Sequence, residues 1–67
     1  MKAKNAIVGA KVMIKKSSRF YYGSCHNPKD SVGTIERINK RRMLPVSVAW
    51  EGGHNVYNYE DLKLVKE

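Results

Sequence analysis

Short apolar runs separated by turn residues fill the second half of the chain, from residue 31 to residue 65. In the run PVSVAW, the side chains of Val46, Val48 and Trp50 occupy alternate positions and would share one face of an extended strand. A run of this length is typical of a strand and too short for an ordinary helix, which needs about 10 residues or more. The pattern therefore predicts an all-β fold.

The same alternation is present near the N-terminus, in the segment AKVMIKK at 10–16. Val12 and Ile14 would lie on one face of this strand, with two lysines and a methionine on the other. The other predicted strands are 32–39, 45–50, 55–57 and 62–65. The predicted core consists of Val12, Ile14, Ile35, Ile38, Val46, Val48, Leu62 and Val65.

Glycine and capping residues mark the connections between these strands. Gly33 is expected at a bulge or sharp bend, where a side chain would obstruct the curvature of the sheet. The segment EGGH at 51–54 predicts a tight hairpin turn, because glycine adopts positive φ without strain. Asn58 or Asp61 is expected to cap a single helical turn before the last strand.

A long loop is predicted at 17–31, where Ser, Gly, Asn and Pro surround the consecutive aromatic residues Phe20, Tyr21 and Tyr22. Loops of this length in small domains are usually functional. Consecutive residues in extended backbone alternate sides, so one or two of these rings should lie at the surface. They would either pin the loop onto the domain or form a stacking or peptide-binding platform, together with Tyr59 in the helical turn.

The order of these elements predicts a five-stranded, partly closed antiparallel barrel. Closure hides sheet edges that an open sheet of this size would expose. An OB-type barrel normally needs a longer chain and a helix between its third and fourth strands, and no such segment is present. We expect one barrel domain at 9–67, preceded by a flexible segment at 1–8.

Cysteine content and hydropathy indicate the compartment. Cys25 is the single cysteine, so no internal disulfide can form, as suits a reducing compartment such as the cytoplasm. No apolar run approaches the roughly 18 residues of a membrane span. Charged residues also interrupt the N-terminal segment before any signal-peptide core could form. We therefore expect a cytoplasmic location and no membrane partner.

Catalytic and metal-binding constellations are not evident in the sequence. Cys25, His26 and His54 are three candidate zinc ligands, whereas a structural zinc site needs about four in paired spacings. The acidic residues do not pair at a spacing that suggests acid–base catalysis, and no glycine-rich phosphate-binding loop is present. We expect no enzymatic activity, no metal and no cofactor.

A spaced pattern covers the chain from about residue 9 to residue 65. It consists of Gly9, Val12, Val32-Gly33-Thr34-Ile35, Val46, Val48, Trp50, Gly53, Asn55, Tyr57, Asp61-Leu62 and Val65, with Tyr21-Tyr22 and Asn27-Pro28-Lys29-Asp30 in the first loop. This pattern resembles the SH3-like barrels of the mind-bomb type, and more closely the small barrel proteins of tailed bacteriophages. The resemblance implies a small SH3-like barrel with a long first loop and a late single helical turn. It also implies an interaction module that binds peptides, modified tails or nucleic acid through loops at one end.

Basic side chains form two groups along the chain. One group is Lys15, Lys16 and Arg19, and the other is Arg37, Lys40, Arg41 and Arg42. In an SH3-like order of elements, the first loop and the second hairpin flank one groove, with the helical turn as its floor. We expect a cationic groove that also contains Tyr21 or Tyr22 and Tyr59. A solvated turn that protects the sheet from edge pairing is the alternative.

The charge balance favours an anionic partner. Thirteen Lys and Arg against six Asp and Glu give a formal net charge of +7, which attracts nucleic acid or acidic proteins. The first hypothesis is a small nucleic-acid-binding accessory protein, with DNA and RNA both open. The second is a protein-binding module, such as a phage factor that docks on an acidic host protein in the host cytoplasm. A nucleic-acid surface should be continuous and free of acid, whereas a protein interface should have an apolar centre and a charged rim.

Overall fold

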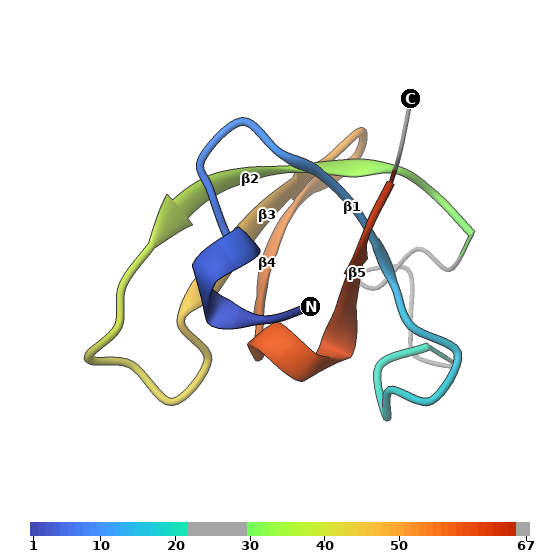
Figure 1. Ribbon diagram of the computed structural model, residues 1–67. Helices are drawn as coiled ribbons and strands as arrows, with labels where there is room; N and C mark the ends of the chain where they lie inside the picture. Colours follow the sequence, from blue (N-terminus) through green and yellow to red (C-terminus); the bar gives the residue numbers. More distant parts are fainter. Residues whose placement is uncertain (22–29, 66–67) are drawn as a thin grey trace.

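The computed structural model is all-β, as predicted, and describes residues 1–21 and 30–65. It contains five antiparallel strands and two short 3-10 turns (Figure 1). The strands are β1 (Lys11–Ile14), β2 (Gly33–Ile38), β3 (Val46–Trp50), β4 (Gly53–Tyr57) and β5 (Leu62–Leu64), and the turns are η1 (Ala3–Asn5) and η2 (Tyr59–Asp61). Within the described residues, no helix is long and apolar enough to cross a membrane.

The five strands form one sheet in the order β4-β3-β2-β1-β5, with every neighbouring pair antiparallel. The sheet curls, so that β2 runs across the top in Figure 1 while the other strands run down from it, β3 and β4 on one side and β1 and β5 on the other. Its concave side encloses the core. This curled sheet, its long first connection and its single helical turn before β5 confirm the predicted small five-stranded antiparallel barrel.

The core agrees with the predicted one at most positions. Six of the predicted residues are buried, namely Val12, Ile14, Ile35, Val46, Val48 and Leu62. Ile38 is partly buried and packs against them. Val65 is only partly buried, beyond the end of β5. Tyr21, Trp50 and Tyr57 complete the core.

Turn-forming and capping residues define both ends of β4. Glu51 and Gly52 form the turn that joins β3 to β4, and Gly53 has a φ of 155°, a value that glycine tolerates best. At the other end, Asn58 and Asp61 cap η2 reciprocally: the Asn58 side chain accepts a hydrogen bond from the Tyr59 amide, and Asp61 Oδ2 accepts one from the Asn58 amide. Both predicted turns are confirmed.

The β2 strand differs from its prediction. Its bulge lies between Ile35 and Arg37, where the pairing with β3 shifts register. Gly33 lies in regular pairing with Val12 instead, and the ring of Trp50 packs against it. The expectation of a bulge at Gly33 was therefore wrong, whereas a side chain there would indeed be obstructed, because the Trp50 ring closely approaches the backbone.

The N-terminal residues contact the barrel. The α-ammonium group of Met1 donates a hydrogen bond of 2.8 Å to the Leu62 carbonyl, and Met1 and Ala6 pack against the core. The Gly9 amide donates to the Ile35 carbonyl. The predicted division of the chain at residue 9 stays a prediction.

Among residues 1–21 and 30–65, Tyr57 is the largest fully buried side chain. Its hydroxyl accepts a 3.0 Å hydrogen bond from Trp50 Nε1, and its ring makes edge contacts with the rings of Phe20 and Trp50. Burial raises the pKa of Tyr57 above the ordinary tyrosine value of 10.0, because a phenolate would lose its hydration inside the core.

Stability should therefore fall at alkaline pH. A raised pKa in the folded state contributes stability that is fully present below pH 10 and is lost as the pH rises through the folded pKa. Urea unfolding from pH 8 to pH 11 should show a steeper loss of unfolding free energy for the wild type than for Tyr57→Phe. The variant should lose about 1 kcal/mol at neutral pH, because Trp50 Nε1 loses its acceptor. Parallel pH curves would contradict this role of Tyr57.

Candidate functional site

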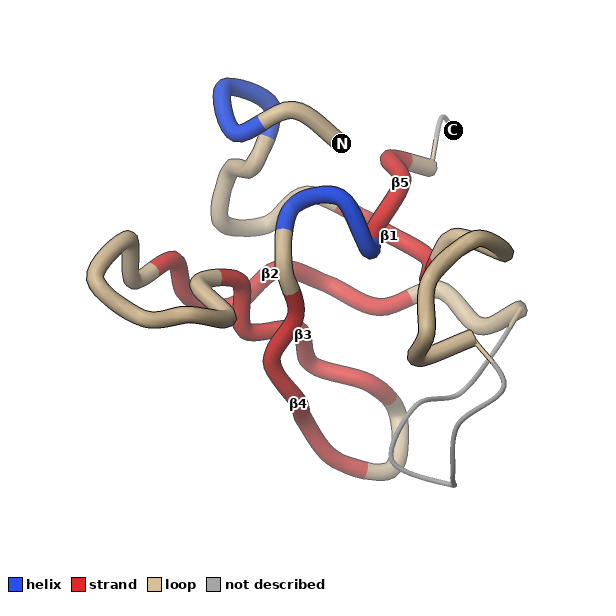
Figure 2. The backbone as a smooth tube through the Cα atoms, turned by 90° about the horizontal axis from the view of Figure 1, so that it is seen from below, coloured by secondary structure: helices blue, strands red, loops and turns tan. Residues whose placement is uncertain are grey.

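A well-formed loop at 39–45, here called the basic loop, connects β2 to β3. Its ends are joined by a 2.8 Å hydrogen bond from the Asn39 amide to the Pro45 carbonyl. Asn39 also organises the tip, because its side-chain Oδ1 accepts from the Arg41 amide and its carbonyl accepts from the Arg42 amide. Figure 2 shows this loop projecting from one end of the sheet. The backbone thus presents Lys40, Arg41 and Arg42 in a fixed turn.

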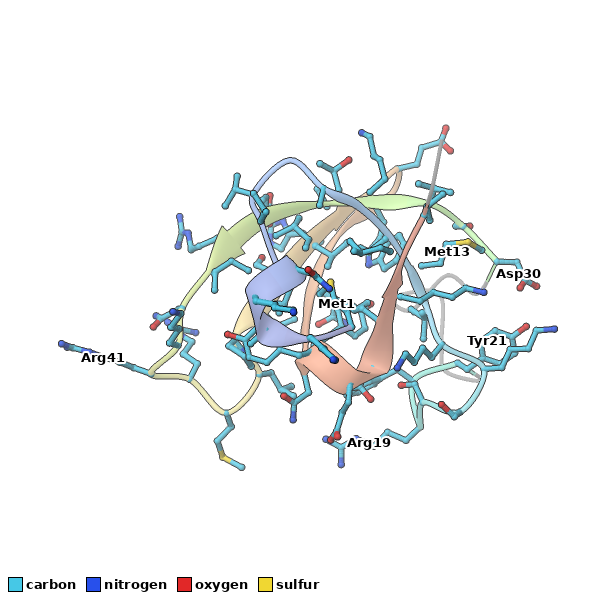
Figure 3. All side chains as sticks on the ribbon, viewed as in Figure 1. Met1, Met13, Arg19, Tyr21, Asp30 and Arg41 are labelled. Atoms are coloured by element: carbon cyan, nitrogen blue, oxygen red, sulfur yellow. The ribbon has the colours of Figure 1, made fainter. Side chains whose placement is uncertain are left out.

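The three cations of the basic loop are exposed, and in Figure 3 Arg41 points away from the molecule. Within residues 1–21 and 30–65 one contact between a basic and an acidic side chain is within 4 Å, that of His54 Nδ1 with Glu36 Oε1 at 3.9 Å, and it involves none of the three loop cations. Among the described residues, therefore, no acidic side chain neutralises the basic loop. Its charge is available to an anionic partner.

A hollow of about 390 Å³ lies beside the basic loop and is here called the outer hollow. Its lining consists of Glu36, Arg37, Asn39, Arg42, Leu44, Pro45, Ser47, His54 and Val56. Ser47 and Val56 are directly paired across β3 and β4, and they alternate along these strands with the buried Val46 and Tyr57. The hollow therefore lies on the outer face of the sheet, on the opposite side from the core.

The β-bulge in β2 shapes this hollow. In a regular strand, consecutive side chains point to opposite faces, yet Glu36 and Arg37 both line the hollow and both are exposed. The extra residue between Ile35 and Arg37 changes the direction of the strand at this point. The bulge thus places a carboxylate and a guanidinium side by side at one site.

Hydrogen bonding fixes the Glu36 carboxylate. Ser47 Oγ donates to Glu36 Oε1 at 2.9 Å, and the His54 imidazole lies 3.9 Å from the same oxygen. Leu44, Pro45 and Val56 add apolar surface to the lining, and Val56 lies directly beside Ser47 across the β3–β4 pair. The outer hollow therefore combines cations, an acceptor carboxylate and an apolar wall.

The other basic group, Lys15, Lys16 and Arg19, lies in the connection after β1. Lys15 and Arg19 line a second hollow of about 630 Å³ together with Glu60 and Asp61 of η2. The buried Ser18 holds this connection in place, because its hydroxyl donates a 2.9 Å hydrogen bond to Asp61 Oδ1. The helical turn thus borders the first basic group, as expected, but it adds negative charge there.

The structure does not bring the two basic groups along one hollow. The lining residues of the two hollows do not overlap, and Figures 1 and 2 place the basic loop and residues 15–21 on opposite sides of the barrel. In Figure 3, Arg41 and Arg19 point away from separate parts of the molecule. A ligand on the basic loop would therefore meet Arg37 and the outer hollow, not Lys15 and Arg19.

Two of the tyrosines expected in the groove, Tyr21 and Tyr59, are placed elsewhere. Tyr21 is only 8% exposed and its hydroxyl donates a 3.0 Å hydrogen bond to Asp30 Oδ1, so it anchors the loop to the core. Tyr59 is half-buried and packs against the core from η2. Tyr22 lies outside the described residues, as do Cys25 and His26, two of the three residues considered as zinc ligands. In the described part of the chain, no three His, Cys, Asp or Glu side chains are close enough to hold a metal ion.

Sequence reasoning located the basic loop but missed most of the outer hollow. Glu36, Ser47, His54 and Val56 were not identified as site residues, although strand alternation alone places Ser47 and Val56 on the face opposite to Val46 and Val48. Comparisons with protein-family models, with curated proteins and with solved structures find no match. The resemblance to phage and mind-bomb barrels stays a prediction, and function is argued from the geometry.

Proposed function

We propose that this protein is a non-enzymatic nucleic-acid-binding protein that holds phosphates with its basic loop. The observation that carries the proposal is the set of three consecutive exposed cations, Lys40, Arg41 and Arg42, on a loop fixed by Asn39 and without an acidic partner among the described residues. Arg37 extends this charge along the end of β2. Arginine in particular matches the oxygen geometry of a phosphate group with paired donors.

The remaining charges support the same partner. A formal net charge of +7 attracts a polyanion over long range and raises the rate of encounter. Lys15, Lys16 and Arg19 lie on another side of the barrel and add to this long-range attraction. The lone cysteine suits a reducing compartment under this proposal, with the host cytoplasm as the location that the phage resemblance implies.

Salt dependence tests this proposal. Each phosphate that a cation neutralises releases counterions, so the logarithm of the binding constant should fall linearly with the logarithm of salt concentration. Titration of labelled DNA and RNA from about 50 to 200 mM salt should show a slope of roughly −2 or steeper, for three or more phosphate contacts. A binding constant that does not change with salt would exclude phosphate contacts as the source of affinity.

Binding to an acidic protein is the second candidate, favoured by one observation. The outer hollow has an apolar wall of Leu44, Pro45 and Val56 and a rim with Arg37 and Arg42. An apolar centre with a charged rim is the usual arrangement of a protein interface. Capture from a cell lysate with and without nuclease separates the two candidates, because a protein partner should stay bound after nuclease treatment.

A further inference from the structure

The outer hollow opens beside the cations that are proposed to hold phosphates. Arg42 belongs both to the basic loop and to the lining of the hollow, and Arg37 lines the hollow from the bulge in β2. A nucleic-acid strand whose phosphates contact these two guanidinium groups would run past the mouth of the hollow. The base of the nucleotide that carries such a phosphate would then be within reach of Glu36, Ser47 and His54.

We propose that the outer hollow receives one unpaired base of a single strand, and that Glu36 favours a base with an exocyclic amino group. This inference rests on the proposed function and adds to it a preference for single strands and a preference among bases. The structure supports it through the size, the walls and the hydrogen-bonding groups of the hollow.

The volume and the apolar lining of the outer hollow suit a single nucleic-acid base. A volume of about 390 Å³ lies near the lower end of the range for small-ligand sites, roughly 300–1,000 Å³. Leu44, Pro45 and Val56 supply an apolar wall against which a base can pack. A base within a duplex is stacked between its neighbours and cannot enter such a hollow without being flipped out of the stack. The hollow should therefore distinguish single strands from duplexes.

The Glu36 carboxylate determines which base fits best. Its Oε1 accepts one hydrogen bond from Ser47 Oγ, and a carboxylate offers acceptor sites on both oxygens and no donor. Cytosine carries an amino group where thymine carries a carbonyl oxygen, and acidic side chains accept from that amino group. Cytosine should therefore bind in the hollow, whereas the thymine carbonyl would meet a carboxylate with no hydrogen between them.

The matched probes are labelled oligo(dC) and oligo(dT) of about 12 nucleotides, a length within the usual site sizes of single-strand binders. A mixed-sequence duplex serves as the third probe. At pH 7.5, the wild type should bind oligo(dC) about tenfold more tightly than oligo(dT), the size expected for one hydrogen bond to a charged group. Glu36→Gln should bring this ratio close to one, because the amide can also donate to the thymine carbonyl.

Two further variants separate the hollow from the basic loop. Ser47→Leu should fill the hollow, weaken oligo(dC) binding by about tenfold and leave duplex binding unchanged. Lys40→Ser with Arg41→Ser, which leaves the lining of the hollow intact, should weaken all three probes by similar factors and keep the preference for oligo(dC). Thermal melts of each variant establish that it is folded.

The possible results test base binding in the outer hollow separately from phosphate binding by the basic loop. Equal binding of oligo(dC) and oligo(dT), unaffected by Ser47→Leu, would overturn the inference while phosphate binding stands. Failure of the wild type to bind any of the three probes would overturn both. Binding of an oligoglutamate peptide that is lost in Ser47→Leu, without a preference for oligo(dC), would show that the hollow is a protein-docking site and would also overturn the inference.

Discussion

Replacement of Lys40, Arg41 and Arg42 together by serine should weaken nucleic-acid binding by at least about tenfold, and it should reduce the salt slope by about two to three. The reason is that each of these exposed side chains is available to one phosphate, and none has an acidic partner among the described residues. Thermal stability should change little, because the loop is held by backbone and Asn39 hydrogen bonds rather than by these side chains. Fluorescence anisotropy titrations at several salt concentrations measure both quantities.

A matched control variant has the same net charge as this triple serine variant. Lys2, Lys4 and Lys63 are also exposed, and their replacement by serine removes the same three charges from elsewhere on the molecule. If the basic loop is the interface, this control variant should keep most of the wild-type affinity. Equal losses in the two triple variants would mean that diffuse net charge, and not the basic loop, attracts the ligand.

Gly33→Ala should strongly destabilise the sheet. An added Cβ would lie 2.6 Å from both Trp50 Cε3 and Val48 Cγ1, well inside van der Waals contact. Both neighbours are buried, so the strain cannot be relieved by moving a side chain into solvent. Overpacking of this kind costs about 1–3 kcal/mol, a large share of the stability of so small a domain.

Gly52→Ala is the control for this prediction. An added Cβ at Gly52 meets no atom within 4 Å, so the substitution should change the unfolding free energy by less than about 0.5 kcal/mol, as is usual at the surface. Chemical denaturation of the two variants gives the comparison. Similar stabilities for Gly33→Ala and Gly52→Ala would contradict the packing of Trp50 on Gly33.

The strands could be predicted from the sequence because their signal is local. Alternation at Val12 and Ile14, and at Val46, Val48 and Trp50, depends only on the two-residue period of a strand, and all five side chains are buried. The turns at Gly52 and Asn58 depend on the backbone preferences of single residues. These features depend on neighbouring residues in the sequence and not on what packs against them, so the sequence alone predicts them.

The bulge and the close approach at Gly33 could not be predicted in this way. The bulge depends on how Arg37 pairs with Ser47 across the sheet, and neither Glu36 nor Arg37 has a conformational preference that marks it. Gly33 is needed because Trp50, from another strand, covers it. Burial of Tyr21 likewise depends on Asp30 and on the core. Each of these features arises from contacts between distant parts of the chain.

The same distinction between local and long-range features applies to the candidate site. The basic loop was found because its three cations are consecutive in sequence and Arg37 lies just before them. The outer hollow was missed because its lining comes from β2, β3, β4 and the loop, and the bulge determines its shape. The expected grouping with Lys15 and Arg19 assumed a relative placement of two loops that local patterns do not determine.

Titration of the wild-type protein against labelled single-stranded and duplex nucleic acid at about 50 mM salt tests the central claim most directly. Even non-specific binders reach dissociation constants of about 1 to 100 μM at physiological salt, and they bind more tightly at lower salt. We predict a complex at or below tens of micromolar protein, tighter with the single strand, which is lost as salt is raised. Absence of any complex at that concentration would contradict nucleic-acid binding by the basic loop, and would leave the acidic protein as the partner to test.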